Sequence, residues 1–201
     1  VFVDRTIVDE LTKRIVEKTK ALRLGIDFGP IVSEEQLRKI EEQINDAVAK
    51  GAKVLIGGQR VPTANGFYFP PTVLTDVNSS MNLMMEECFG PVLPIVPVSA
   101  TEEAIASANS TPYGLGASVW TSDITKGEKI AKSLEAGMVW VNDVNVAFPE
   151  APWGGVKQSG PGIELSEWGL YEYVHKKHVN LETSADTHRY WWYPYPEISE
   201  G

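Results

Sequence analysis

The chain is 201 residues long and has 18 lysines and arginines against 27 aspartates and glutamates, which gives a formal net charge of -9. Hydrophobic residues make up 43%, enough for a core, and the length fits one domain or one domain with an appendage. The acidic balance argues against a nucleic-acid partner, and the longest apolar run, residues 92–98, is too short to span a membrane.

Hydrophobic periodicity and turn residues divide most of the chain into alternating strands and helices. Thr6 and Ser33 are predicted to cap the first two helices, and Pro70 with Pro71 predicts that the extended segment around them lies at a sheet edge. In chain order, the pattern predicts strands or extended segments at 1–3, 53–56, 67–74, 92–98, 116–121 and 138–141, and helices at 6–23, 33–50, 101–109 and 123–136.

Strands that alternate with capped helices are typical of βαβ units. The predicted fold is therefore α/β, with a mostly parallel sheet covered by helices on both faces. Residues 142–162 are rich in glycine and proline and read as irregular, followed by a short helix at 164–172 and a strand at 173–181. We expect a main domain over residues 1–170, and a C-terminal β arm with an aromatic tail over residues 171–201.

No complete catalytic set is evident from the residues themselves. His175, His178 and His188 lack further ligands at a recognised spacing, so they are interpreted as surface residues and no metal site is assigned. Cys88 is the only cysteine and cannot form an internal disulfide, which predicts a reducing, cytoplasmic location. Neighbouring carboxylates would raise its thiol pKa, so a small buried side chain is favoured over a nucleophile. The glycine-rich segment 154–162 fits neither a dinucleotide fingerprint nor a phosphate loop.

Four sequence strings, taken together and in order, resemble the C-terminal part of the NAD(P)-dependent aldehyde dehydrogenase family. The strings are EECFGPV at 86–92, YGL at 113–115, GMVWVN at 137–142 and PWGGVKQSG at 152–160. The resemblance extends from residue 1 to about residue 179. In this family a cysteine thiolate attacks the aldehyde, hydride passes to the nicotinamide, and a glutamate base helps water to hydrolyse the thioester.

The resemblance implies that the reaction needs residues outside this sequence. The family's nucleophilic cysteine, glutamate base and Rossmann domain precede the strand that matches residues 1–3, so no catalytic residue is assigned here. The chain alone is expected to be inactive and to bind NAD or NADP weakly or not at all. Two alternatives stay open: a non-catalytic docking module, or one subunit of a split enzyme. An enzyme that uses Cys88 as its own nucleophile is the least favoured hypothesis.

The resemblance also assigns roles to individual residues. Glu87 matches the carboxylate that accepts hydrogen bonds from the nicotinamide ribose hydroxyls, and Phe89 matches the aromatic residue beside the nicotinamide. The alternatives are a helix-end carboxylate for Glu87 and an ordinary core residue for Phe89. Val146, Phe148 and Trp153 match the segment that lines the substrate tunnel, where apolar side chains exclude water and orient an aldehyde. The alternative for these three is simple loop packing.

The last part of the chain resembles the start of the family's oligomerisation arm. The strand that would pair with it comes from elsewhere, so an unpaired edge beside a tail rich in tyrosine and tryptophan is expected. Residues 171–195 are therefore predicted to join a second copy of the chain or another partner chain.

Overall fold

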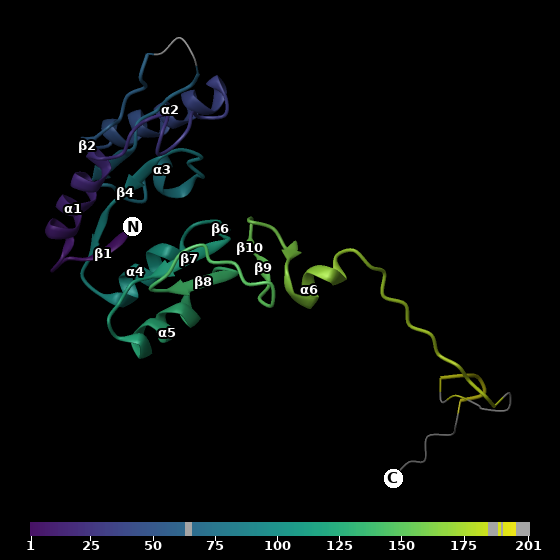
Figure 1. The fold of residues 1–201 in the computed structure, drawn as a ribbon. Coiled ribbons are helices and arrows are strands. Elements are labelled where there is room, and N and C mark those ends of the chain that lie inside the picture. The colour runs from purple at the N-terminus through teal and green to yellow at the C-terminus, as the bar shows by residue number, and fades with distance from the viewer. Residues whose placement is uncertain (63–65, 185–188, 190, 196–201) are drawn as a thin grey trace.

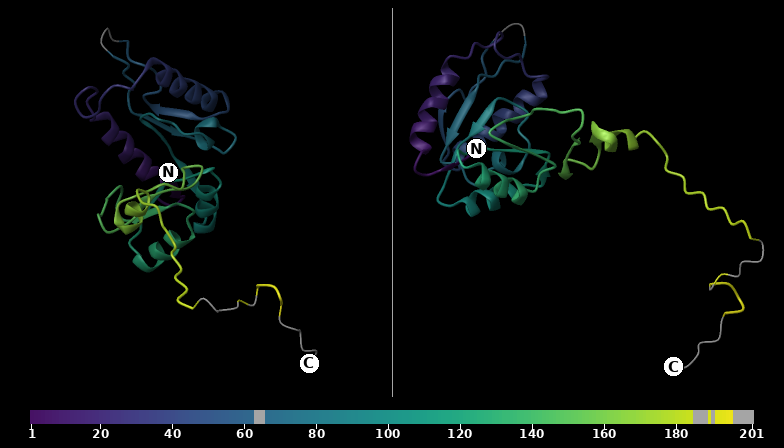
Figure 2. Two further views of the ribbon diagram at one scale, coloured as in Figure 1. Left: turned by 90° about the vertical axis from the view of Figure 1, so that its right-hand side faces the viewer. Right: turned by 60° about the horizontal axis from the view of Figure 1, so that its bottom comes forward.

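A computed structural model describes residues 1–62, 66–184, 189 and 191–195 of the chain. The body has two parts, with α1 and α2 in the upper part and α5 in the lower part, and a long C-terminal segment leaves it on one side (Figures 1 and 2). The strands are β1 (Phe2–Asp4), β2 (Lys53–Ile56), β3 (Thr72–Thr75), β4 (Val92–Pro94), β5 (Val96–Val98), β6 (Tyr113–Gly114), β7 (Gly116–Val119), β8 (Met138–Val141), β9 (Trp153–Gly154), β10 (Val156–Lys157) and β11 (Ile163–Glu164). The helices are α1 (Val8–Lys20), α2 (Glu34–Ala49), α3 (Asn82–Met85), α4 (Thr101–Asn109), α5 (Ile124–Ser133) and α6 (Ser166–Tyr171).

The upper part is built on a three-stranded sheet in which β3 is central. It pairs antiparallel with β2 and parallel with β4. The predicted sheet-edge position of the segment around Pro70 and Pro71 is therefore wrong. Both prolines precede β3, which begins at Thr72, so neither removes a donor from the strand itself.

The run at 92–98, predicted as one strand, forms two. β4 pairs with β3, whereas β5 pairs in parallel with β1. The change of partner occurs at Ile95, which is fully buried and donates its backbone N–H to Leu74 O at 2.8 Å. The next residue, Val96, donates instead to Val1 O at 2.9 Å.

Helices cover both faces of this sheet, as predicted. Leu74 of β3 belongs to the cluster formed with the apolar face of α2, including Ile40 and Ile44. Its neighbour Val73 belongs to a second cluster, against which α1 packs. Successive residues of a strand point to opposite faces, so one short strand serves both clusters. The parallel pairs β1–β5, β3–β4 and β7–β8 confirm the predicted α/β fold with mostly parallel sheets.

The two helix caps predicted in this part have different outcomes. Ser33 caps α2, because its Oγ accepts the backbone N–H of Gln36 at 3.2 Å. Thr6 does not cap α1: its backbone N–H and its hydroxyl both donate to Asp4 Oδ1, at 2.9 and 2.6 Å, and the helix begins only at Val8. The turn after β1 therefore uses Thr6 as a donor.

The lower part contains the parallel pair β7–β8 with α5 packed against both strands. Its connection to the upper part is short, since only two residues separate β5 from α4, and α4 contacts β1, β5 and α5. The region predicted to be irregular, 142–162, contains two very short strands. β9 pairs with β11 and β10 pairs with β6, both antiparallel.

The C-terminal segment is extended and runs away from the body (Figures 1 and 2). The strand predicted at 173–181 is not formed, because residues 175–184 pair with no other backbone as a strand. A strand needs a neighbour for its N–H and C=O groups. Tyr190 and His188 of the predicted tail, with residues 196–201, lie outside the described residues. Within the described ranges, no helix is long and apolar enough to cross a membrane.

Candidate functional site

The predicted coenzyme residues Glu87 and Phe89 lie on the loop between α3 and β4, and both are exposed. The Phe89 side chain is 67% exposed, which is unusual for a phenylalanine and contradicts its alternative interpretation as a core residue. Glu87 lies two residues beyond the end of α3. The loop thus presents a carboxylate and an aromatic ring to the outside, one residue apart.

Side chains of α2 contact the backbone of this loop. Gln43 Nε2 donates to Glu87 O at 3.2 Å, and Gln36 Nε2 donates to Phe89 O at 3.4 Å. Gly90 lies so close to α2 that an added Cβ would be 2.4 Å from Ile40 Cδ1. The glycine of the EECFGPV string is therefore required by the close approach of the loop to a buried helix face.

Cys88, between Glu87 and Phe89, is partly buried and packs against the α2 cluster. Burial raises the pKa of its thiol to about 11, partly offset by a backbone hydrogen bond with Gly90. The cause is desolvation, not the neighbouring carboxylates invoked from the sequence. At neutral pH the group is a thiol rather than a thiolate, so the interpretation of Cys88 as a small, partly buried, unreactive residue agrees with the structure.

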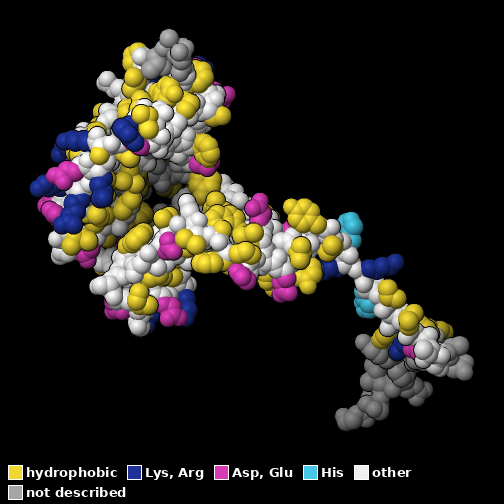
Figure 3. All heavy atoms as spheres, viewed as in Figure 1, with side chains coloured by type: hydrophobic (Ala, Val, Ile, Leu, Met, Phe, Trp, Pro, Cys, Tyr) yellow, Lys and Arg dark blue, Asp and Glu magenta, His cyan; other side chains and the backbone are white. Residues whose placement is uncertain are grey.

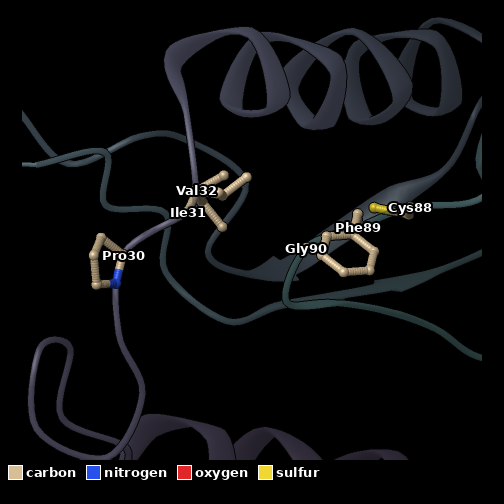
Figure 4. Close-up of a pocket in the computed structure, with 6 residues that line it drawn as sticks. All are labelled: Pro30, Ile31, Val32, Cys88, Phe89 and Gly90. Carbon is tan, nitrogen blue, oxygen red and sulfur yellow. The ribbon is translucent and has the colours of Figure 1, made fainter.

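A shallow, open hollow of ≈ 380 Å³ adjoins the loop. Pro30, Ile31 and Val32, which precede α2, line one side, and residues 88–90 line the other (Figure 4). The lining is mainly apolar, and the Phe89 ring lies along its edge. Such a surface can hold a flat ring of a ligand while the Glu87 carboxylate accepts hydrogen bonds from hydroxyl groups.

The predicted tunnel residues lie in the lower part and are arranged around Trp140 of β8. Trp140 Nε1 donates to Val146 O at 3.0 Å, and its ring is 5.8 Å from that of Trp153, centroid to centroid. Phe148 is 55% exposed, and its carbonyl accepts the N–H of Ala151 at 3.0 Å. The structure therefore brings Val146 and Trp153 to one aromatic centre and leaves the Phe148 side chain at the surface.

Two side chains fix the ends of this region. Asn142, with a positive φ of 58°, accepts the N–H of Thr121 and donates to its carbonyl, both at 2.8 Å, so its side chain holds the backbone at the end of β8. Lys157 Nζ donates to Asn109 O at 2.7 Å, at the end of α4, and pairs with Glu135 at 2.7 Å. A cation is favourable beside the free carbonyls of a helix C-terminus.

The predicted site residues thus form two groups, one on the α3–β4 loop and one around Trp140. In the space-filling view, hydrophobic side chains are prominent where the upper and lower parts face each other (Figure 3). The supporting residues Gln43 and Trp140 were not identified from the sequence. The sequence does mark Gln43 as unusual, since it is a polar residue on the otherwise apolar face of α2, beside Ile40 and Ala47. Among the described residues, no group of three or more histidines, cysteines, aspartates and glutamates could hold a metal ion.

Comparison with known proteins identifies the family to which the chain belongs. Residues 1–179 match the aldehyde dehydrogenase family. The chain belongs to this family. Aminoaldehyde dehydrogenase 1 of Pisum sativum, a peroxisomal protein, is 43% identical over 192 residues, which are 94% of this chain and 38% of that protein. Betaine aldehyde dehydrogenase of Bacillus subtilis is 42% identical over 190 residues, which are 90% of this chain and 39% of that protein.

Solved structures of the same family share the fold. Apo betaine aldehyde dehydrogenase from Staphylococcus aureus, as a glycine-to-serine mutant, superposes with a TM-score of 0.87 at 38% identity, covering 95% of this chain and 40% of that one. The same enzyme in complex with NAD+ gives a TM-score of 0.85 at 37% identity, covering 96% of this chain and 40% of that one. This aldehyde dehydrogenase chain therefore spans about two fifths of the length of the relatives it matches.

Proposed function

We propose that the chain supplies part of the coenzyme and substrate sites of an aldehyde dehydrogenase that oxidises an aldehyde to a carboxylic acid with NAD or NADP. The observation that carries this proposal is the α3–β4 loop, which presents Glu87 and an exposed Phe89 beside an apolar hollow. In this proposal residues 1–170 are part of the catalytic domain, and residues 171–201 are the oligomerisation arm and tail.

The residues of the loop suit a nicotinamide nucleotide. A carboxylate accepts hydrogen bonds from two neighbouring hydroxyl groups at once, which is the task proposed for Glu87 at the nicotinamide ribose. The exposed ring of Phe89 offers a flat apolar face for the nicotinamide, and the hollow beside it is lined mainly by apolar side chains. The coenzyme supplies the hydride acceptor, whereas the chain's own residues orient it.

We infer that Trp153, Phe148 and Val146 form walls of the substrate tunnel, and that the substrate is a cationic aldehyde. The relatives named above support the second part, since they are an aminoaldehyde dehydrogenase and betaine aldehyde dehydrogenases. The ring of Trp153 is held next to Trp140, and a tryptophan face attracts an ammonium group within about 6 Å of its centroid. An apolar wall that also attracts cations would favour these aldehydes over neutral ones of equal size.

The nucleophile and the base are proposed to come from outside these 201 residues. Cys88 is the only cysteine, its thiol pKa is raised to about 11, and it packs against the α2 cluster. A protonated, partly buried thiol does not attack a carbonyl at neutral pH. The chain alone is therefore expected to show no sustained aldehyde oxidation with either coenzyme.

The C-terminal segment is proposed to pair with a second copy of the chain or with a partner chain. Its backbone is extended, and side chains such as Tyr173 and Leu181 are more than four fifths exposed. A docking module that is not itself catalytic is the alternative, and the same exposed segment favours it. A cytoplasmic location stays a prediction, because some relatives are peroxisomal or chloroplastic.

The test is a chimeric enzyme in which these 201 residues replace the matching part of the Bacillus subtilis relative. We expect the chimera to oxidise aminoaldehydes or betaine aldehyde, and Glu87→Gln to raise its KM for NAD about tenfold or more, because charge-assisted hydrogen bonds are lost. Glu86→Gln is the matched control, since the neighbouring carboxylate is also exposed. Equal kinetics for both variants would contradict the role of Glu87. Sustained turnover by the 201 residues alone would contradict the external nucleophile.

A further inference from the structure

We propose that Gln43 is a positioning residue, which fixes the α3–β4 loop so that Glu87 and Phe89 are held in place before any coenzyme binds. This inference rests on the proposed function for the use of the loop. Its structural basis is independent and lies in α2. Gln43 is only 8% exposed and is one of two buried polar residues in the described part of the chain. Its side-chain amide donates to Glu87 O at 3.2 Å.

A buried amide is costly unless it is hydrogen-bonded, so the pairing is strongly favoured over a free glutamine and a free carbonyl. Among described residues that are not exposed, no buried side-chain nitrogen or oxygen lacks a partner, and Gln43 is therefore satisfied where it lies. Leucine or methionine at this position would fill the same apolar face of α2 and leave Glu87 O without this donor. The choice of glutamine serves the loop and is not required by the core.

Neighbouring contacts show how one hydrogen bond can help to fix the conformation of the α3–β4 loop. Gln36 lies seven residues earlier, two turns away on the same side of α2, and donates to Phe89 O at 3.4 Å. Gly90 rests against Ile40, between these two glutamines along the helix. Gln43 is the buried member of this set and acts on the residue that carries the carboxylate. Because α2 is a long helix packed in the core, it provides a rigid support for the loop.

Cys88 provides a direct reporter, since it lies between Glu87 and Phe89 and is the only thiol in the chain. Packing against α2 slows its reaction with a disulfide reagent such as dithiobis(nitrobenzoate), so a loop that opens more often exposes the thiol more and reacts faster. We compare the full 201-residue chain with Gln43→Met, which keeps the volume and removes the donor. The matched control is Ile44→Val, which shortens the next side chain of α2 and keeps the Gln43 hydrogen bond.

We expect Cys88 in Gln43→Met to react about tenfold faster than in the wild type, the factor that corresponds to one ordinary hydrogen bond. Ile44→Val, compared at a denaturant concentration that equalises global stability, is expected to react at the rate of the wild type. Equal acceleration in both variants, or none in Gln43→Met, would overturn the proposal. The measurement uses no coenzyme, so a failure here is distinct from a failure of the Glu87 kinetics in the chimera.

Discussion

Replacing Gly90 with alanine tests the close contact between the proposed coenzyme loop and α2. The new Cβ would lie 2.4 Å from Ile40 Cδ1 and 2.8 Å from Ile40 Cγ1, whereas carbon atoms in contact prefer about 3.5–4.0 Å. Ile40 is fully buried in the α2 cluster, so it has little freedom to move. Overpacking of this kind costs about 1–3 kcal/mol, and the lower entropy of the unfolded alanine chain returns about 0.4–1 kcal/mol.

The net loss in the free energy of unfolding is therefore about 1–2 kcal/mol, or about 2–8 °C in Tm for a chain of this size. Urea unfolding followed by tryptophan fluorescence measures it. Gly29→Ala is the matched control, because its Cβ would meet nothing within 4 Å and its φ is not in the left-handed region. We expect this control to be neutral or slightly stabilising.

A double-mutant cycle with Ile40→Val identifies the contact. Valine lacks the Cδ1 atom that lies nearest to the new Cβ, so the double variant should lose less stability than the two single variants together. If the effects of Gly90→Ala and Ile40→Val simply add within about 0.5 kcal/mol, the contact is not the cause and the reasoning is refuted.

Three further predictions follow from individual contacts. Asn142→Ala is expected to lower the free energy of unfolding, measured in urea, by about 2–3 kcal/mol, because two hydrogen bonds to Thr121 disappear and alanine disfavours a φ of 58°. Asn142→Gly should lower it less, since glycine accepts this φ, and equal losses in the two variants would exclude a backbone contribution. Lys157→Met is expected to lower the free energy of unfolding by about 1.5–3 kcal/mol, since the carbonyls of Asn109 and Thr111 lose a charged donor. Lys157→Arg, which keeps a charged donor, should lose less stability in the same urea experiment. The free energy of unfolding should fall as pH rises from 9.0 towards 11, because in this range the folded Cys88 thiol keeps a proton that the unfolded thiol loses. Cys88→Ser should lack this pH-dependent loss, and the same pH dependence of stability in the wild type and in Cys88→Ser would contradict the raised pKa.

Local patterns were sufficient for most of the elements. The apolar face of α2 and its Ser33 cap follow from spacing alone, because helix periodicity and capping act within a few residues. The division of the run at 92–98 did not follow, since both halves are extended and apolar. Only the identity of their partners, β3 for one and β1 for the other, separates them. The predicted strand at 173–181 failed for the related reason that a strand depends on a partner backbone.

Of the candidate site, only the residues that belong to the four family strings could be predicted from the sequence. Glu87, Phe89 and Trp153 were selected because their strings resemble a family, and the structure adds that Phe89 is exposed and that Trp153 lies against Trp140. The support from Gln43 depends on a contact between residues 44 positions apart, which no local pattern contains. Helical periodicity can identify Gln43 as a polar residue on an apolar face, but it cannot identify the Glu87 carbonyl as its hydrogen-bond acceptor.

The change of partner at Ile95 has a structural consequence. β4 and β5 follow one another along the backbone, with β4 hydrogen-bonded to β3 and β5 hydrogen-bonded to β1. Only two residues then separate β5 from α4. Ile95, where the partner changes, packs with Val3 of β1 and Val73 of β3 in one buried cluster, so the two ladders are joined through the same core. The backbone that leads from the loop of Glu87 to the lower part, which holds Trp140, is thus hydrogen-bonded first to β3 and then to β1 before it reaches α4.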